Sequence, residues 1–201
     1  MPLQAAFGFK LHTGWAALVV ISGCPGKIQL HLRQRIELLP PDNSIPRFVY
    51  HEASECPLAQ AREMVKRAAK ASREAARLAV KQSIGELEAR GIRVRVCGVL
   101  CGSTPIPDDL PAVLRSHPLI HSAEGALFQN AIVSACESCA MTPFLARERE
   151  VWARAAEAWG VAEPGLRQEV DGLRKSAGSP WSADQKAATA IALLALQSRK
   201  V

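Results

Sequence analysis

Residues 7–22 read FGFKLHTGWAALVVIS and hold two strand-like runs separated by a short polar break. The apolar run that begins at Phe7 is interrupted by His12-Thr13-Gly14 and resumes over residues 15–21. Strand-forming residues on both sides of a short turn, with Gly14 available for positive φ, predict a β-hairpin. Functional groups often collect on loops that a rigid sheet holds in place, so the polar turn residues are candidates for function.

Further strands are predicted downstream of this hairpin. Residues 28–39, IQLHLRQRIELL, alternate apolar and polar side chains, which is the period of a half-buried strand. Residues 92–100, IRVRVCGVL, alternate at first and then become wholly apolar, as in a more central strand. A short strand is expected over 141–145, and the segment 46–57 is expected to be an irregular connection.

Helical periodicity dominates the rest of the chain. The longest helical signal, 57–90, places small residues such as Ala61, Ala68 and Ala76 on one face, which suits close packing against a sheet. A helix is predicted from His121 to Ala140, with Ser122 as its N-cap. The remaining predicted helices are 148–159, 165–175 and 182–197.

This order of elements predicts an α/β fold with a mixed sheet. The first three strands form an antiparallel meander, the later strands run parallel, and helices flank the sheet. At 201 residues, we expect a single domain spanning 1–201, with 148–201 as its helical C-terminal part.

Composition sets the remaining bounds. An apolar fraction of 48% predicts a folded core, and the net charge of +6 allows a polyanionic partner without requiring one. The chain shows no signal peptide, and its longest apolar stretches, 15–21 and 187–196, are well short of the roughly 20 residues of a membrane span. We therefore expect a cytoplasmic protein with no membrane segment. Its six cysteines lie largely in apolar segments, which favours free thiols.

Two short motifs resemble the ribonuclease H-like superfamily, in its branch of RuvC-type Holliday-junction resolvases. The first is Gly8-Phe9-Lys10 followed by Thr13-Gly14-Trp15-Ala16, where the family pattern has a glycine, an apolar residue and an aspartate, and then Thr-Gly-Trp. The second is the start of the last helix, residues 183–188, where an acidic residue begins a run of alanines. The resemblance implies a ribonuclease H-like core, DNA or RNA as the partner and, if the protein is an enzyme, a phosphodiester hydrolase that uses Mg²⁺ or Mn²⁺.

The catalytic carboxylates of that family are incomplete here. The family places its first acid on the first strand, where this chain has Lys10, and a second on or just after the fourth strand, where residues 96–99 offer none. Asp184 alone stands where the pattern has a carboxylate. Two-metal cleavage needs several carboxylates to hold cations about 3.5–4 Å apart. An ammonium group at position 10 puts positive charge where Mg²⁺ would bind, which argues against the usual mechanism.

Two acids nevertheless occupy equivalent positions, each two residues after a serine that could cap a helix. We predict that Glu124 and Asp184 come together as the catalytic acidic pair. The alternative is that each acid stabilises the N-terminus of its own helix through the helix dipole, with Ser182 and Gln185 forming a capping box.

Four polar residues are predicted to contact phosphate or nucleic acid around this pair: Lys10, His12, Thr13 and Lys186. Histidine is poised to exchange protons near neutral pH, so His12 could also act in proton transfer. The alternative for His12 and Thr13 is that their side chains satisfy backbone groups of the turn. The metal that such a site would hold is left open.

Two other patterns have competing interpretations. Cys136-x-x-Cys139 and Cys97-x-x-x-Cys101 have spacings that suggest zinc, but they lie in a helix and at a strand end rather than on the turns that structural zinc uses. A basic stripe, Arg62, Lys66, Lys70, Arg73, Arg77 and Lys81, follows the long helix. It could track a nucleic-acid backbone, although a solvated helix face is the more common explanation.

Three functions follow from these patterns. The first is a divergent nuclease or nucleic-acid-binding protein, and the second is a non-catalytic scaffold or protein-interaction module on the same fold. The third and weakest is a single-domain relative of the actin-like and sugar-kinase phosphotransferases. That class needs two such domains around a nucleotide, whereas this chain has room for one.

Overall fold

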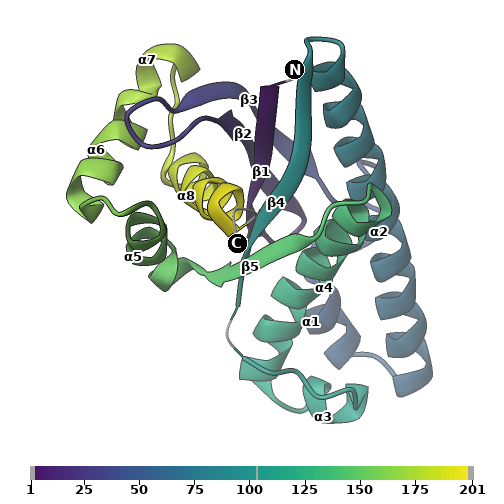
Figure 1. Cartoon of the computed structure of the whole chain (residues 1–201). Helices are drawn as coiled ribbons and strands as arrows, with labels where there is room; N and C mark the ends of the chain where they lie inside the picture. The colour runs from purple at the N-terminus through teal and green to yellow at the C-terminus, as the bar shows by residue number, and fades with distance from the viewer. Residues whose placement is uncertain (1–2, 103, 199–201) are drawn as a thin grey trace.

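The computed structural model describes residues 3–102 and 104–198, which form a five-stranded mixed sheet with helices on both faces (Figure 1). The strand order is β3-β2-β1-β4-β5. β2 runs antiparallel to β1 and β3, and β4 runs parallel to β1 and β5. The strands are β1 (Leu3–His12), β2 (Trp15–Ser22), β3 (Gln29–Glu37), β4 (Ile92–Cys101) and β5 (Pro143–Arg147). The predicted meander and the mixed α/β sheet are therefore confirmed.

The opening hairpin closes through a two-residue turn. His12 pairs with Trp15 across the turn, and Gly14 between them has φ of 83°. A side chain would strain the backbone in that region, so glycine is the natural residue there. The predicted hairpin is confirmed.

Eight helices connect and cover the described strands. They are α1 (Val49–Ser54), α2 (Leu58–Glu88), α3 (Leu110–Leu114), α4 (His117–Ser138), α5 (Glu148–Trp159), α6 (Glu163–Gly172), α7 (Arg174–Ala177) and α8 (Ala183–Ser198). The long helix, the helix from Glu148 and the closing helix agree with the sequence analysis.

Two helix predictions are wrong. α4 begins at His117, four residues before the predicted start, because Pro118 fits the first turn of a helix, where its missing N–H costs nothing. Ser122 is consequently not a cap. The segment 46–57, predicted to be irregular, contains α1, a short helix that is held by buried Val49 and Ala53 rather than by local capping.

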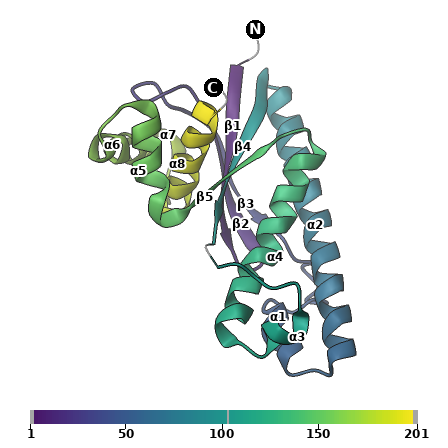
Figure 2. The ribbon, with the colours of Figure 1, turned by 60° about the horizontal axis from the view of Figure 1, so that its bottom comes forward.

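The two faces of the sheet carry separate apolar cores, because successive side chains of a strand point to opposite faces. Phe7 and Phe9 of β1 belong to the core formed with α2 and α4. Ala6 of the same strand belongs to the core formed with α5, α6 and α8. Figure 2 shows the sheet between these two groups of helices.

α8 lies unusually close to the sheet. A Cβ atom on Gly8 would lie 1.8 Å from the backbone oxygen of Ala188, and one on Gly98 would lie 2.4 Å from that of Ile191. The two glycines pair with each other across β1 and β4. Their lack of side chains is therefore what allows α8 to seat on the centre of the sheet.

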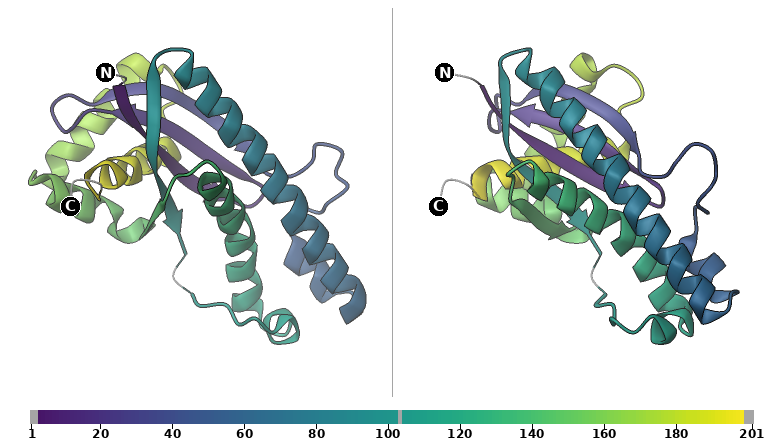
Figure 3. Two further views of the ribbon diagram at one scale, coloured as in Figure 1. Left: turned by 45° about the vertical axis from the view of Figure 1, so that its right-hand side comes forward. Right: turned by 90° about the vertical axis from the view of Figure 1, so that its right-hand side faces the viewer.

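One end of α2 extends past the sheet. There it lies beside α1, as Figure 3 shows in two views. Within residues 3–102 and 104–198, none of the helices combines the length and apolar character needed to cross a bilayer.

Candidate nucleic-acid interface

The carboxyl ends of β1, β4 and β5 lie at one edge of the sheet, the position at which open α/β folds commonly bind ligands. An open pocket of about 440 Å³ lies at this edge. Its walls come from the ends of β1 and β4, from Glu148 at the start of α5, and from His121, Ser122 and Gly125 on α4. The topology therefore assembles a crevice from segments that are far apart in the sequence.

Lys10 lines this crevice and forms an ion pair with Glu148. The lysine side chain is 17% exposed, whereas that of Glu148 is 55% exposed. Glu148 is also the first residue of α5, where a carboxylate is favoured by the helix dipole. The crevice thus holds an internally compensated charge pair.

His12 is fixed by two neighbours at the tip of the hairpin. Its ring stacks on Trp15, with centroids 4.1 Å apart and planes within 6° of parallel. Its Nε2 atom lies 3.0 Å from Oδ1 of Asp184, without hydrogen-bond alignment to any described residue. The guanidinium of Arg35 covers the Trp15 ring at 4.0 Å. The structure therefore brings His12 and Asp184 together, although 172 residues separate them in the sequence (184 minus 12).

Asp184 also lies in the first turn of α8, between Ser182 and Gln185, which form the predicted capping box. The backbone N–H of Ser182 donates to Oε1 of Gln185 at 3.0 Å, and the N–H of Gln185 donates to Oγ of Ser182 at 3.4 Å. The capping box is confirmed. It fixes the start of α8, and with it the position of Asp184 beside the hairpin.

The other predicted phosphate contacts have local partners. The backbone carbonyl of Thr13 accepts a hydrogen bond from Nε of Arg47 at 3.2 Å. Nζ of Lys186 lies 2.9 Å from Oδ1 of Asp171 on α6. Neither residue is in the set that lines the crevice pocket. Their contacts with phosphate remain predictions.

Glu124 is buried and contacts α1, which the sequence did not predict. It is 3% exposed and lies in the second turn of α4, since that helix begins at His117. Its Oε1 atom accepts hydrogen bonds from the backbone N–H groups of Tyr50 at 2.7 Å and His51 at 3.3 Å. These are unsatisfied N–H groups at the start of α1, so Glu124 caps a helix other than its own. Burial, and then the negative charge of Glu124, raise the pKa of Tyr50.

Glu124 and Asp184 consequently have different partners. Glu124 faces α1, whereas Asp184 faces the hairpin tip. Among the described residues, the only three potential metal ligands whose ligand atoms lie within 4.8 Å of one another are His51, His117 and His121, and none of them is acidic. A two-metal centre of the nuclease type therefore does not fit the residues of this crevice.

The three histidines are residues that sequence reasoning missed. His117 and His121 have the i, i+4 spacing that places two side chains on one helix face. That signal is lost when the helix is assumed to begin at His121, because His117 then falls in the preceding loop. His51 lies in the segment that was predicted to be irregular.

The cysteines do not form a zinc site in the described part of the chain. All six are free, and no cysteine joins a compact group of three potential ligands. Cys136 is buried beside Cys97, and the hydrogen bond between the two thiols, followed by burial, raises the pKa of Cys136 well above its ordinary value. A neutral buried thiol packs as a small apolar group, as the sequence predicted.

A second open pocket of about 650 Å³ adjoins the crevice between α2 and α4. The two pockets share Ile106 and Ala126 as lining residues. The far wall of the second pocket includes Arg62, Lys66 and Arg73 of the basic stripe. The two pockets are therefore adjacent, and together they are called the groove, with Lys10 in the first pocket and the basic face of α2 in the second.

Solved structures provide the comparison for this architecture, since no protein-family model and no curated protein sequence matches the chain. The Thermus thermophilus RuvC structure superposes with a TM-score of 0.55 at 13% identity, covering 98% of this chain and 95% of that one. RuvC of T. thermophilus in complex with a Holliday junction substrate gives a TM-score of 0.57 at the same identity and coverage. This chain has a RuvC-like, ribonuclease H-like fold.

Proposed function

We propose that this chain binds nucleic acid along the groove that joins the crevice at Lys10 to the basic face of α2. The observation that carries the proposal is that the two pockets are adjacent, sharing Ile106 and Ala126 as lining residues, and that the second has basic side chains of α2 in its wall. T. thermophilus RuvC, which shares the fold over nearly the whole chain, has been solved with a Holliday junction. A branched or duplex DNA is therefore the first ligand to test.

The charges of the groove support a phosphate-backbone ligand. In the described part of the chain, Arg62 and Arg73 of this wall make no ion pair, and both are exposed. Arg77 is different, because its guanidinium is held by Glu74. Cations that are not already compensated can release counterions from phosphates on binding, and this supplies most of the affinity for a nucleic-acid backbone.

The crevice itself supports binding more than two-metal cleavage. Lys10 places an ammonium group at the first-strand position, and its partner Glu148 is engaged with it. We infer that Lys10 serves as a phosphate contact once Glu148 is displaced, or as the fixed positive end of the groove. The proposed activity is thus recognition, and the scaffold hypothesis remains the competing function.

Binding of a fluorescent four-way DNA junction against salt concentration tests the proposal. We expect log K to fall linearly with log[salt], with a slope of roughly −0.9 per phosphate contact. The variant R62A/K66A/R73A should weaken binding to all sequences and reduce the magnitude of the slope by roughly 1 for each lost contact. A slope near zero for the wild-type protein would remove nucleic acid as the partner and favour the scaffold.

The matched control removes three positive charges that lie outside the groove. Lys27, Arg174 and Lys175 are exposed basic residues on the side of the sheet that α6 and α7 cover. K27A/R174A/K175A should leave the slope unchanged, and an equal effect of the two triple variants would show that net charge, not the groove, binds DNA. Cleavage in Mn²⁺ that is lost in Asp184→Asn would instead revive the nuclease hypothesis.

A further inference from the structure

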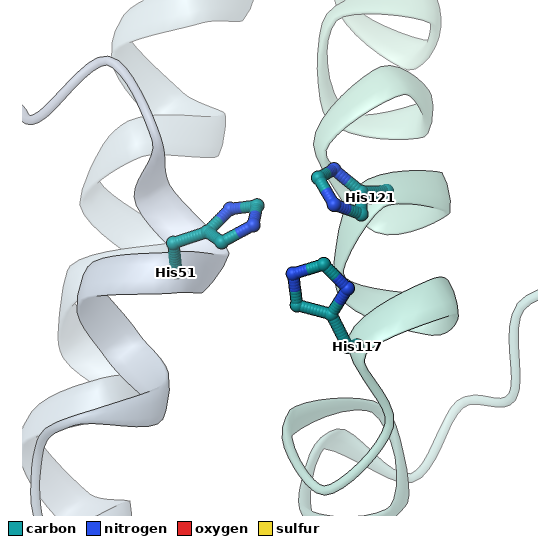
Figure 4. Close-up of side chains that lie close together, drawn as sticks. All are labelled: His51, His117 and His121. Atoms are coloured by element: carbon teal, nitrogen blue, oxygen red, sulfur yellow. The ribbon is translucent and has the colours of Figure 1, made fainter.

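Three histidines form a cluster of potential metal ligands that is separate from the Lys10–Glu148 pair. His51 comes from α1, and His117 and His121 come from the first two turns of α4. One ring nitrogen of each lies within 4.8 Å of the others. Figure 4 shows His51 reaching from one helix toward the two histidines of the other.

The rings are arranged edge to face, so their nitrogens, rather than their faces, can converge. Ring centroids are 4.4 Å apart for His117 and His121, and 4.7 Å apart for His51 and His121. The rings of His51 and His117 are 5.7 Å apart and nearly perpendicular. Three imidazoles packed in this way share a small space between two helices.

A buried carboxylate orients one of the three rings. Nδ1 of His51 lies 3.3 Å from Oε1 of Glu124, so an Nδ1–H group can donate to the carboxylate and leave Nε2 of His51 as a free electron-pair donor. Histidine ligands of metals commonly donate their second nitrogen to a carboxylate in this manner. The other oxygen of Glu124, Oε2, is buried and has no hydrogen-bond partner among the described residues. A nearby cation would compensate that charge.

We propose that His51, His117 and His121 bind a first-row divalent transition metal, with zinc as the expected ion, and that Glu124 positions His51. Three neutral imidazoles suit Zn²⁺, Cu²⁺ or Ni²⁺ better than Mg²⁺, which prefers oxygen ligands. Zinc bound tetrahedrally by imidazole nitrogens at about 2.0–2.1 Å needs those nitrogens about 3.3 Å apart. Side-chain rotations that bring the three ring nitrogens closer by roughly 1.5 Å or less would therefore form the site.

The proposed site is an open one. The described residues supply three ligands, and His117 and His121 are exposed, so the fourth tetrahedral position is left for water or an exchangeable anion. His121 also lines the crevice pocket. The metal would therefore sit beside the groove, although its binding does not depend on what the groove binds.

Competition with a chromophoric zinc chelator, followed by cobalt substitution, tests the proposal on the full-length protein stripped of metal. We expect a single zinc equivalent to bind, and Co²⁺ to give the visible absorption of a tetrahedral site without the thiolate-to-cobalt band in the near ultraviolet. H117A and H121A should each weaken binding by at least about 100-fold, because each removes a ligand. E124Q should weaken it by roughly 10–100-fold with the same cobalt spectrum, which is typical of an outer-shell partner.

Two histidine variants outside the cluster, H12A and H31Q, serve as controls and should bind zinc as the wild type does. Because His117 and His121 are exposed, their replacement should not disturb folding, and thermal unfolding of the metal-free variants checks this. Absence of zinc binding by the wild type would overturn the proposal. So would zinc that survives in the H117A/H121A double variant, or a thiolate band that assigns the metal to the cysteines.

Discussion

At the end of β1, one residue changes what the crevice can do. Lys10 stands where the RuvC-type pattern that the opening motif resembles has an aspartate, and it points to the same face of β1 as His12 because the two are separated by two positions. Its ammonium group forms an ion pair with the carboxylate of Glu148. Oδ1 of Asp184 lies 3.0 Å from Nε2 of His12. Both positions thus have partners that only the folded chain supplies.

His31 provides a prediction at this scale. It lies at an irregularity in the pairing of β2 with β3, with its Nε2 2.7 Å from Oγ of Ser22. Burial, and then the charge of Arg90, lower its pKa below 6.5. The unfolded state therefore takes up a proton at higher pH than the folded state does. The free energy of unfolding should be unaffected above about pH 6.5 and should fall as the pH drops toward the lower folded pKa.

Urea unfolding at roughly pH 7.5 and pH 5 measures this loss. H31Q removes the titrating ring, so its stability should fall less between the two pH values than that of the wild type. R90Q removes only the second cause, so it should give an intermediate result. If H31Q loses as much stability as the wild type, other groups govern the acid response.

At the scale of elements, the position of α8 is the feature on which the crevice depends. α8 packs across β1, β2 and β4, and its first turn carries Asp184 to the hairpin tip. Gly8 and Gly98 permit this approach. The sequence shows both glycines, but it does not show that the same helix covers them, because that contact joins segments about 90 residues or more apart.

Substitution of Gly8 tests the packing of α8. In Gly8→Ala, the new methyl group would meet the Ala188 backbone oxygen at 1.8 Å, and backbone cannot rotate away as a side chain can. We expect a loss of about 3 kcal/mol or more in the free energy of unfolding, at the upper end of typical overpacking. Chemical denaturation measures it.

Gly85→Ala is the matched control, because Gly85 lies in α2 and an added Cβ there meets no atom within 4 Å. It should stabilise the protein by about 0.5–1 kcal/mol, since alanine is the better helix former. A Gly8→Ala protein as stable as the wild type would show that α8 does not lie against β1 as described.

At the scale of the whole molecule, a single sheet separates two apolar cores. Residues 148–198 supply the helices of one core, but they also contact the sheet directly through α8. Glu169 of α6 accepts a hydrogen bond from the backbone of Gly26, and Arg33 of β3 donates to the backbone oxygen of Pro180. These contacts favour one cooperative unit over an independent C-terminal part, and the single domain stays a prediction.

The distribution of tryptophans allows this to be tested. Trp152, Trp159 and Trp181 all lie in the C-terminal part, whereas Trp15 lies on β2. In a W15F variant, tryptophan fluorescence reports on the C-terminal part alone, while far-ultraviolet circular dichroism also reports on α2 and α4, which lie outside it. We expect the two signals to change at the same urea concentration. An earlier fluorescence transition would divide the chain into two units.

The sequence by itself determined the elements whose signals are local. The hairpin, the alternation of residues 28–39, the long helix and the capping box at Ser182 each follow from the spacing of neighbouring residues, and the structure contains all of them. The antiparallel meander and the mixed sheet followed as well, since few topologies suit that order of elements. The start of α4 was misplaced because Pro118 was compatible with both a loop and a first helical turn.

The tertiary structure alone decided which side chains meet. Glu124 caps α1, Lys10 pairs with Glu148, and three histidines from two helices share one space. No periodic pattern in the sequence predicts these contacts, because each depends on the distance and angle at which separate elements pack. Local propensity fixes an element's type, whereas the burial of two apolar faces against one sheet fixes where its polar residues end up.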